Sequence, residues 1–259
     1  MRKGANRTEI ICQMLEDIPL MTVKQLADTL DVSEMTVRRD IAVLKDKQLI
    51  NVFFGGISLN REHEATRQAV GKYVYENEIR TLREEKIRIA RKAASLIQPN
   101  DVIFIDTGST VGSIIDAIPN DKNIIIYSYA LSIINSASSR DNLQVVCAGG
   151  YFHKNTRMFE SEDGANLIKK ATINKAFLAT RGLSENGVTT AENYEVPMKK
   201  AAINASLQTI LLVDSSKIGK SWYAKYADLD DIDIIITDTG IPESYVKLFE
   251  SHQIKVHIV

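Results

Sequence analysis

The strongest constraint on the fold is the pattern of residues 23–44, which reads as two short helices joined by a tight turn. In the first part of this segment, apolar side chains recur at helical spacing, at Val23, Leu26, Ala27 and Leu30. The polar stretch Asp31-Val32-Ser33 interrupts this periodicity before a second apolar stripe begins. Ser33 is expected to cap the second helix, because serine accepts hydrogen bonds from first-turn amides. The pattern predicts a helix-turn-helix.

The second helix of this pair has an apolar face and a polar face. Helical spacing directs three apolar side chains toward the rest of the small domain: Val37, Ile41 and Leu44. The opposite side carries Met35, Arg39 and Ala42, flanked by Thr36 and Arg38. Arginine can bind guanine edges in the major groove, and threonine can contact a base or a phosphate. We therefore predict a surface for double-stranded DNA made of Ser33, Met35, Thr36, Arg38 and Arg39. The plainer interpretation is a solvated helix face with ordinary charges.

Net charge does not by itself indicate a nucleic-acid partner, since the formal net charge is −1. Affinity for DNA must therefore come from clustered cations. One cluster is the arginine pair of the second helix. The other is Arg2, Lys3 and Arg7, ahead of a helix predicted for residues 7–17 and closed by Pro19. Arg7 is accordingly added to the predicted DNA-binding residues.

The run Val-Ser-Glu-Met-Thr-Val-Arg-Arg-Asp-Ile at residues 32–41, followed by a Gly-Gly turn, resembles the DeoR family of bacterial transcriptional regulators. This resemblance implies a winged helix-turn-helix ahead of a sugar-phosphate-sensing domain. Residues 49–57 read as the hairpin of the wing. Here the chain departs from the family, because Val52-Phe53-Phe54 replaces the usual basic residues and histidine. Two interpretations stand: the wing contacts DNA, or Phe53 or Phe54 packs against the helices.

The length of 259 residues leaves room for one small and one larger domain. We predict a winged helix-turn-helix at residues 1–58, a linker at 59–82 where charges of both signs alternate, and a second domain at 83–259. In that domain, strands are predicted at 102–105, 123–127, 143–148, 176–179, 209–213, 232–237 and 255–258, with intervening helices at 111–118, 130–139 and 242–251. Several strands are continuous apolar runs, which is typical of parallel strands covered on both faces. An α/β domain with a doubly wound, mostly parallel sheet is expected.

In such a sheet, ligands bind beyond the carboxyl ends of the strands. The first strand is followed by Asp106-Thr107-Gly108-Ser109-Thr110. Gly108 permits close backbone approach, and the hydroxyls and free amides of this loop favour an anion such as phosphate. The loop is not a Walker A motif, because its lysine and glycine spacing are missing. Asp106 would repel a phosphate but could accept hydrogen bonds from hydroxyls, which indicates a phosphorylated sugar or polyol. The alternative is an ordinary capped turn.

Other strand ends extend this pattern. Asp214-Ser215-Ser216-Lys217 places a lysine where it could neutralise an anion, unless Lys217 is an ordinary surface residue. These two loops resemble the DeoR-family sensor domain in order, together with Glu85-Lys86, Gly149-Gly150 and Pro197-Met198-Lys199-Lys200. That domain is similar to ribose phosphate isomerase and glucosamine phosphate deaminase folds. The resemblance implies an effector site formed by Asp106, Gly108, Ser109, Thr110 and Lys217, with Gly149, Gly150 and Lys199 near it.

Arg181 departs from the family, which often has an acidic residue at this position before a glycine. Three interpretations are open: a second phosphate contact, a more acidic effector, or an exposed side chain. Trp222 and Tyr223 are interpreted as core or subunit contacts, with stacking on a sugar ring as the alternative.

Two functions from different classes fit these features. The first is a repressor of a carbohydrate-use operon that leaves DNA when a phosphorylated sugar or polyol binds. It would act as a homo-oligomer, a dimer or tetramer, because helix-turn-helix proteins read paired half-sites. The second is an isomerase- or deaminase-like enzyme with a DNA-binding appendage. An isomerase needs an acid/base pair beside its substrate, and Asp106 is the one obvious candidate. We therefore expect a regulator and not an enzyme.

The remaining residue types narrow the list of partners. The histidines lack metal-like spacing, and Cys12 and Cys147 are interpreted as buried thiols, so neither a metal nor a cofactor is expected. No apolar stretch approaches the length of a membrane-spanning helix. The protein is therefore expected in the cytoplasm, with no membrane partner.

Overall fold

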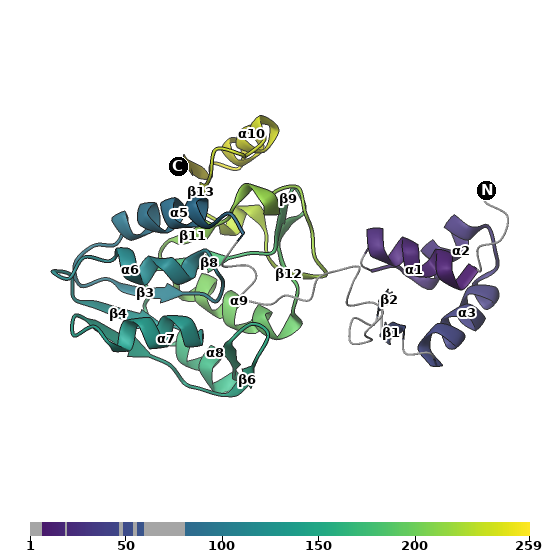
Figure 1. Ribbon diagram of the computed structural model, residues 1–259, viewed down its shortest axis with the longest axis horizontal. Helices are drawn as coiled ribbons and strands as arrows, with labels where there is room; N and C mark the ends of the chain where they lie inside the picture. Colours follow the sequence, from purple (N-terminus) through teal and green to yellow (C-terminus); the bar gives the residue numbers. More distant parts are fainter. Residues whose placement is uncertain (1–6, 19, 47–48, 54–55, 60–80) are drawn as a thin grey trace. The chain divides into compact units, whose positions relative to one another are not determined.

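The computed structural model describes residues 7–18, 20–46, 49–53, 56–59 and 81–259 (Figure 1). It divides into two compact units, residues 1–72 and 73–259. Arg2, Lys3 and most of the predicted linker lie outside the described residues. None of the helices in the described ranges could span a lipid bilayer.

The first unit has three helices followed by a two-stranded hairpin. Its helices are α1 (Arg7–Asp17), α2 (Val23–Leu30) and α3 (Glu34–Asp46), and the antiparallel strands are β1 (Ile50–Phe53) and β2 (Gly56–Leu59). Buried apolar side chains from all five elements form one core: Ile11, Leu15, Leu26, Val37, Ile41, Leu44, Ile50 and Ile57. The predicted inward face of α3 is therefore confirmed.

Local hydrogen bonds fix the turn between α2 and α3. Asp31 ends α2 in the left-handed conformation, with φ of 53°, which aspartate tolerates better than most residues. The hydroxyl of Ser33 accepts a hydrogen bond of 3.2 Å from the backbone amide of Thr36, so the predicted N-cap is present. Met21 and Ile57 exchange two backbone hydrogen bonds of 3.1 and 2.8 Å. These bonds attach the segment before α2 to the hairpin.

The predicted wing is the β1–β2 hairpin. Val52 is 43% exposed on this hairpin. The side chains of Phe53 and Phe54 lie outside what the structure describes, so the choice between DNA contact and packing against the helices stays a prediction.

The second unit is built on a seven-stranded parallel sheet (Figure 1). Its strands are β3 (Val102–Ile105), β4 (Ile124–Tyr127), β5 (Leu143–Val146), β8 (Lys175–Ala179), β11 (Thr209–Leu212), β13 (Ile234–Thr237) and β14 (Lys255–Ile258). Their spatial order is β14-β13-β11-β8-β3-β4-β5. The chain starts in the middle at β3, runs out to β5, returns to β8 on the other side of β3 and runs out to β14. This order confirms the predicted doubly wound sheet and puts its switch point between β3 and β8.

Helices cover both faces of the sheet. On one face lie α5 (Arg83–Ser95), the 3-10 turn η1 (Val111–Ser113), α6 (Ile114–Ala117) and α7 (Leu131–Ser138). On the other lie α8 (Glu162–Lys169), α9 (Val196–Ala205) and α10 (Glu243–Ser251). Alternate strand residues enter the two cores, as Ile103 and Ile105 do on the first face and Phe104 on the second. Burial on both faces explains why these strands are apolar throughout.

Several elements differ from the predicted ones. The sequence did not predict the antiparallel sheet of β9 (Gly182–Ser184), β10 (Gly187–Thr190) and β12 (Ala224–Ala227), or the hairpin of β6 (Tyr151–His153) and β7 (Met158–Glu160). Such short strands hold too few residues to show an alternating pattern. The predicted strand 143–148 ends at Val146, so Cys147 is exposed and the predicted burial of its thiol is wrong. Cys12 is half-buried.

Candidate functional site

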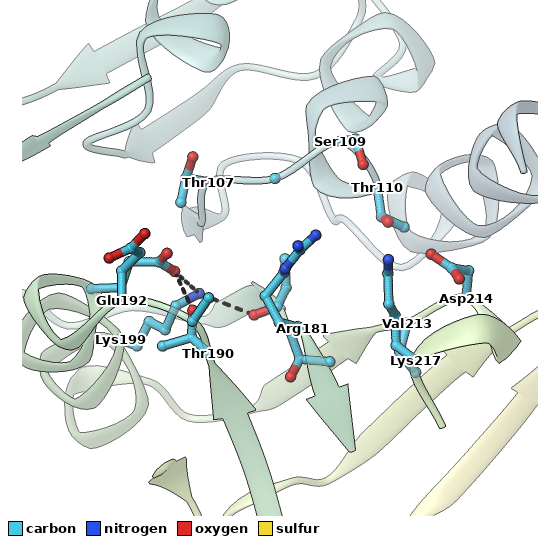
Figure 2. Close-up of a pocket in the computed structure, with 15 residues that line it drawn as sticks. Thr107, Ser109, Thr110, Arg181, Thr190, Glu192, Lys199, Val213, Asp214 and Lys217 are labelled. Carbon is cyan, nitrogen blue, oxygen red and sulfur yellow. Dashed lines mark hydrogen bonds and ion pairs between the residues drawn. The ribbon is translucent and has the colours of Figure 1, made fainter. Parts of the chain in front are cut away.

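A pocket lies at the carboxyl ends of β3, β8 and β11, beside the switch point of the sheet (Figure 2). It contains about 540 Å³ of empty space, including its open mouth. Its lining residues are Thr107, Gly108, Ser109, Thr110, Ala179, Thr180, Arg181, Thr190, Ala191, Glu192, Glu195, Lys199, Val213, Asp214 and Lys217. This is the place where doubly wound sheets bind ligands.

The loop after β3 forms one wall of the pocket, as its glycine and hydroxyl residues suggested. Gly108 has a φ of +142°, which residues with a Cβ rarely adopt. A Cβ at this position would lie 3.0 Å from the Cβ of Ala179, so glycine lets the loop pass close to the end of β8. Ser109 and Thr110 follow it along the same wall.

Gly108→Ala is expected to destabilise the protein by about 2 kcal/mol, because alanine is strained at this φ and crowds Ala179. Gly149→Ala is the matched control: it also has a positive φ, of +72°, but open space around the added Cβ. Its expected cost is about 1 kcal/mol. Urea unfolding of the two variants measures both effects, and an equal loss would contradict the role assigned to Gly108.

Two cations of the pocket, Arg181 and Lys217, lie at one side, together with the carboxylate of Asp214. Figure 2 shows Arg181 and Lys217 nearer to Ser109 and Thr110 than to Glu192. Lys217 belongs to η3 (Ser215–Lys217), the turn directly after β11. Arg181 follows β8, and its guanidinium carbon lies 5.3 Å from the ring centre of Trp222. Trp222 is thus placed beneath a pocket cation and is not among the lining residues.

A buried ion-pair network lies at the opposite side of the pocket. The Lys199 ammonium donates hydrogen bonds to the Asp106 carboxylate and, at 3.0 Å, to the Ala179 carbonyl. It also lies 3.3 Å from the carboxylate of Glu195. These three charged side chains are at most 7% exposed. Burial alone would lower the pKa of Lys199, but the charges of Asp106 and Glu195 raise it, so the ammonium stays charged.

Asp106 is placed beneath the pocket and is not among the residues that line it. Its carboxylate accepts hydrogen bonds from the Tyr129 hydroxyl, the Lys199 ammonium and the amides of Thr107 and Ala179, the last two at 2.7 and 2.9 Å. Burial raises the pKa of Tyr129, which keeps its hydroxyl a donor. Because four donors already occupy its oxygens, Asp106 acts on Lys199 and not on ligand hydroxyls.

The acidic side of the pocket was missed by the sequence reasoning. Glu195 accepts a hydrogen bond of 2.8 Å from the Thr190 hydroxyl, and burial raises the pKa of its carboxyl group. Glu192 accepts a bond of 3.2 Å from Asn155 at the rim. The available signal was the pair of carboxylates three residues apart, directly after the hydroxyl-rich strand β10.

Gly149 and Gly150 are not brought to this pocket, in contrast to what the resemblance implied. Gly149 lines a separate small pocket with Tyr129 and Cys147. A Cβ on Gly150 would lie 2.1 Å from the backbone oxygen of Glu160. This glycine is therefore explained by close packing against the end of β7.

The outer face of α3 is accessible within the first unit. Met35 is 62% exposed, the Arg38 side chain is 60% exposed, and Arg39 is also exposed. Ser33 and Thr36 bond to each other at the start of the helix. Arg7, by contrast, makes a two-point ion pair with Asp40, at 2.5 and 3.1 Å. Arg7 thus holds α1 against α3.

Comparison with known proteins supports both halves of this description. Residues 7–63 match the model of the DeoR-like helix-turn-helix domain, and residues 81–239 match that of the DeoR C terminal sensor domain. The chain is 32% identical to the HTH-type transcriptional regulator IolR of Bacillus subtilis, over 92% of each chain. It is 30% identical to the deoxyribose operon repressor of Escherichia coli, over 96% of this chain and 98% of that one.

Solved structures give weaker likenesses. Ribose 5-phosphate isomerase A of Methanocaldococcus jannaschii is 16% identical, with a TM-score of 0.40 over 53% of this chain and 55% of its own. The sorbitol operon regulator SorC of Klebsiella pneumoniae is 12% identical, with a TM-score of 0.41 over 95% of this chain and all of its own. At these scores neither likeness bears on function.

The two family models together span most of the sequence, in the order that the motifs predicted. The two relatives match this chain over nearly their whole length, and they are named as a transcriptional regulator and an operon repressor. The prediction of a regulator in place of an enzyme is therefore confirmed. This chain belongs to the DeoR family of DNA-binding transcriptional regulators, with the helix-turn-helix domain first and the sensor domain second.

Proposed function

We propose that this regulator is a repressor of a carbohydrate-use operon, released from its operator when a phosphorylated sugar or polyol binds in the strand-end pocket. The observation that carries the proposal is the uneven charge of the pocket. Arg181 and Lys217 lie near the hydroxyls of Ser109 and Thr110. The carboxylate on this side, Asp214, is paired with the buried Lys86, whereas Glu192 and Glu195 lie across the pocket. A ligand with an anion at one end and hydroxyls at the other matches this arrangement.

In this proposal the phosphate group binds at the cationic side. Lys217 and Arg181 supply charge-assisted hydrogen bonds, and Ser109 and Thr110 supply hydroxyl donors. The sugar hydroxyls then reach the acidic side, where Glu192 lines the rim. Lys199 lines the same side, held by Asp106 and Glu195. The buried ion pairs give this side a fixed geometry against which hydroxyl positions can be distinguished.

The DNA-binding surface in the proposal is the outer face of α3, with Ser33, Met35, Thr36, Arg38 and Arg39. We further propose a homodimer or homotetramer, because helix-turn-helix proteins read paired half-sites. Residues 1–58 would form the DNA-binding domain and 59–82 the linker to the sensor domain at 83–259. The effector must favour the state that does not fit both half-sites, since a ligand shifts an equilibrium only through differential affinity.

The direct test is binding to the DNA upstream of the protein's own gene, followed by fluorescence anisotropy. We expect affinity to fall steeply as salt rises, as it does for proteins that neutralise DNA phosphates. One member of a panel of sugar and polyol phosphates should then dissociate the complex, while its unphosphorylated counterpart should not. Failure of every phosphorylated ligand to release the DNA would contradict the proposal.

Lys217→Ala is expected to raise the effector concentration needed for release by about 10- to 100-fold, because a charged hydrogen bond to the phosphate is lost. Affinity for DNA without effector should stay unchanged. Lys220→Ala is the matched control, since Lys220 is an exposed lysine nearby that does not line the pocket. Anisotropy titrations of the two variants provide the comparison. An unaltered effector response in Lys217→Ala would move the phosphate site elsewhere.

A further inference from the structure

A second pocket lies between α5 and the segment formed by η1 and α6. It contains about 1270 Å³ of empty space, including its open mouth. Three cationic side chains of α5 line it, Arg83, Lys86 and Arg91, against one carboxylate, Asp116. Of these cations, Lys86 is paired with Asp214 of the strand-end pocket, which leaves the charge of Arg83 and Arg91 to be explained.

The helical repeat of α5 explains why these cations converge. Arg83 and Arg91 are eight residues apart with Ile87 between them at four, so all three lie on one side of the helix. Lys86 precedes Ile87 and lines the same pocket. The opposite wall is formed by η1 and α6, which pack beside α5 (Figure 1). Ser113 of η1 adds a hydroxyl group to this wall.

The cations differ in burial, which gives the pocket both a fixed and an adaptable part. The Lys86 side chain is 3% exposed, and its ammonium lies 3.8 Å from the Asp214 carboxylate. Arg83 and Arg91 are exposed at the mouth. Arg88 of the same helix pairs with Glu85, whereas neither Arg83 nor Arg91 forms an ion pair with another described residue. Their guanidinium groups remain available for two-point bonds to an oxyanion.

We propose that this pocket is a second anion-binding site, which binds a phosphate group. It adjoins the strand-end pocket: Ser109 lines both, and the Lys86–Asp214 ion pair joins a lining residue of each. The phosphate group can therefore be the second one of a ligand that begins in the strand-end pocket, or a separate phosphorylated molecule. The site itself does not depend on the effector proposed above.

The test uses the full-length protein in the absence of DNA. The probe is inorganic phosphate, added at constant ionic strength. Binding is measured from the rise in melting temperature with phosphate concentration. Lys217→Ala is used as the background, to weaken the strand-end site. In this background, Arg83→Gln/Arg91→Gln is expected to weaken phosphate binding by about tenfold. All the substituted side chains on α5 are exposed, so the fold should be retained, as checked by the melting temperature without phosphate.

Arg88→Gln is the control and is compared with Arg91→Gln alone, because each removes one positive charge from α5 but only Arg91 of the two lines the pocket. An equal effect of Arg88→Gln would show a general loss of charge and would overturn the second site. An unchanged phosphate response in Arg83→Gln/Arg91→Gln would also overturn it. If Lys217→Ala alone leaves phosphate binding intact while the arginine pair abolishes it, the strand-end phosphate site fails and the second site stands.

Titrations of the wild type and of Arg83→Gln/Arg91→Gln with two sugar phosphates identify the source of the phosphate group. A hexose bisphosphate that binds about tenfold more tightly than its monophosphate, with the gain lost in Arg83→Gln/Arg91→Gln, supports one ligand spanning both pockets. Equal affinities of the two sugars, with inorganic phosphate still lost in the variant, support a separate phosphorylated molecule.

Discussion

Replacing both Arg38 and Arg39 by alanine is expected to weaken operator binding by about 100-fold or more, because each arginine contact to a base contributes about 1–3 kcal/mol. Both side chains are exposed on the outer face of α3. Among the described residues of the first unit, Arg38 pairs with Glu34 on the same helix, at 3.7 Å with both side chains more than half exposed. Such surface pairs contribute little to stability, so the fold should be retained.

Lys45→Gln is the matched control for this variant, since Lys45 is an exposed cation in the last turn of the same helix. Its operator affinity should change only slightly at a fixed salt concentration. Anisotropy titrations over a salt series distinguish base contacts from phosphate contacts, because losing one phosphate contact reduces the salt slope by about one. Normal operator affinity in Arg38→Ala/Arg39→Ala would mean that another element binds the DNA.

The helix-turn-helix could be predicted residue by residue because its signals are local. The inward positions Val37, Ile41 and Leu44 follow the helical period, and the Ser33 cap stands directly before α3. The parallel strands were equally visible, since a strand covered on both faces is apolar at every position. The order of those strands then put the switch point, and with it the pocket, beside Gly108 and Lys217.

The acidic side of the pocket could not be predicted, because it depends on contacts between distant segments. Glu195 and Lys199 are four residues apart, but their shared partner Asp106 is 93 residues from the lysine. No local period reveals such a contact. Gly150 shows the opposite error: a glycine pair at a strand end resembled a ligand loop, whereas close approach to Glu160 explains the residue. A glycine can indicate that there is no room for a Cβ, but it does not tell whether a ligand or the protein itself fills the space.

Lys199→Met is expected to lower the free energy of unfolding by about 3–5 kcal/mol, the usual effect of removing one partner from a buried ion pair. Methionine keeps much of the side-chain volume, so the loss reports mainly on charge. Without the ammonium, Asp106 and Glu195 remain as two buried carboxylates, each at most 7% exposed. Lys200→Met is the control, since Lys200 is the exposed neighbour on the same helix. Urea unfolding at neutral pH measures both.

The pH dependence of the loss separates charge from packing. Burial already raises the pKa of Glu195 above its ordinary value, whereas the charge of Lys199 lowers it. Removing Lys199 should therefore raise the pKa of Glu195 further. A carboxyl whose folded-state pKa exceeds its unfolded one favours the folded state at low pH, and that contribution disappears as pH rises through the folded value. The loss in free energy of unfolding caused by Lys199→Met should therefore be smaller at about pH 5 than at about pH 8. Adding Glu195→Gln to the same chain should reduce this loss at the higher pH. A deficit that is equal at both pH values would assign the loss to packing around the lysine stem and would remove the electrostatic basis for the fixed side of the pocket.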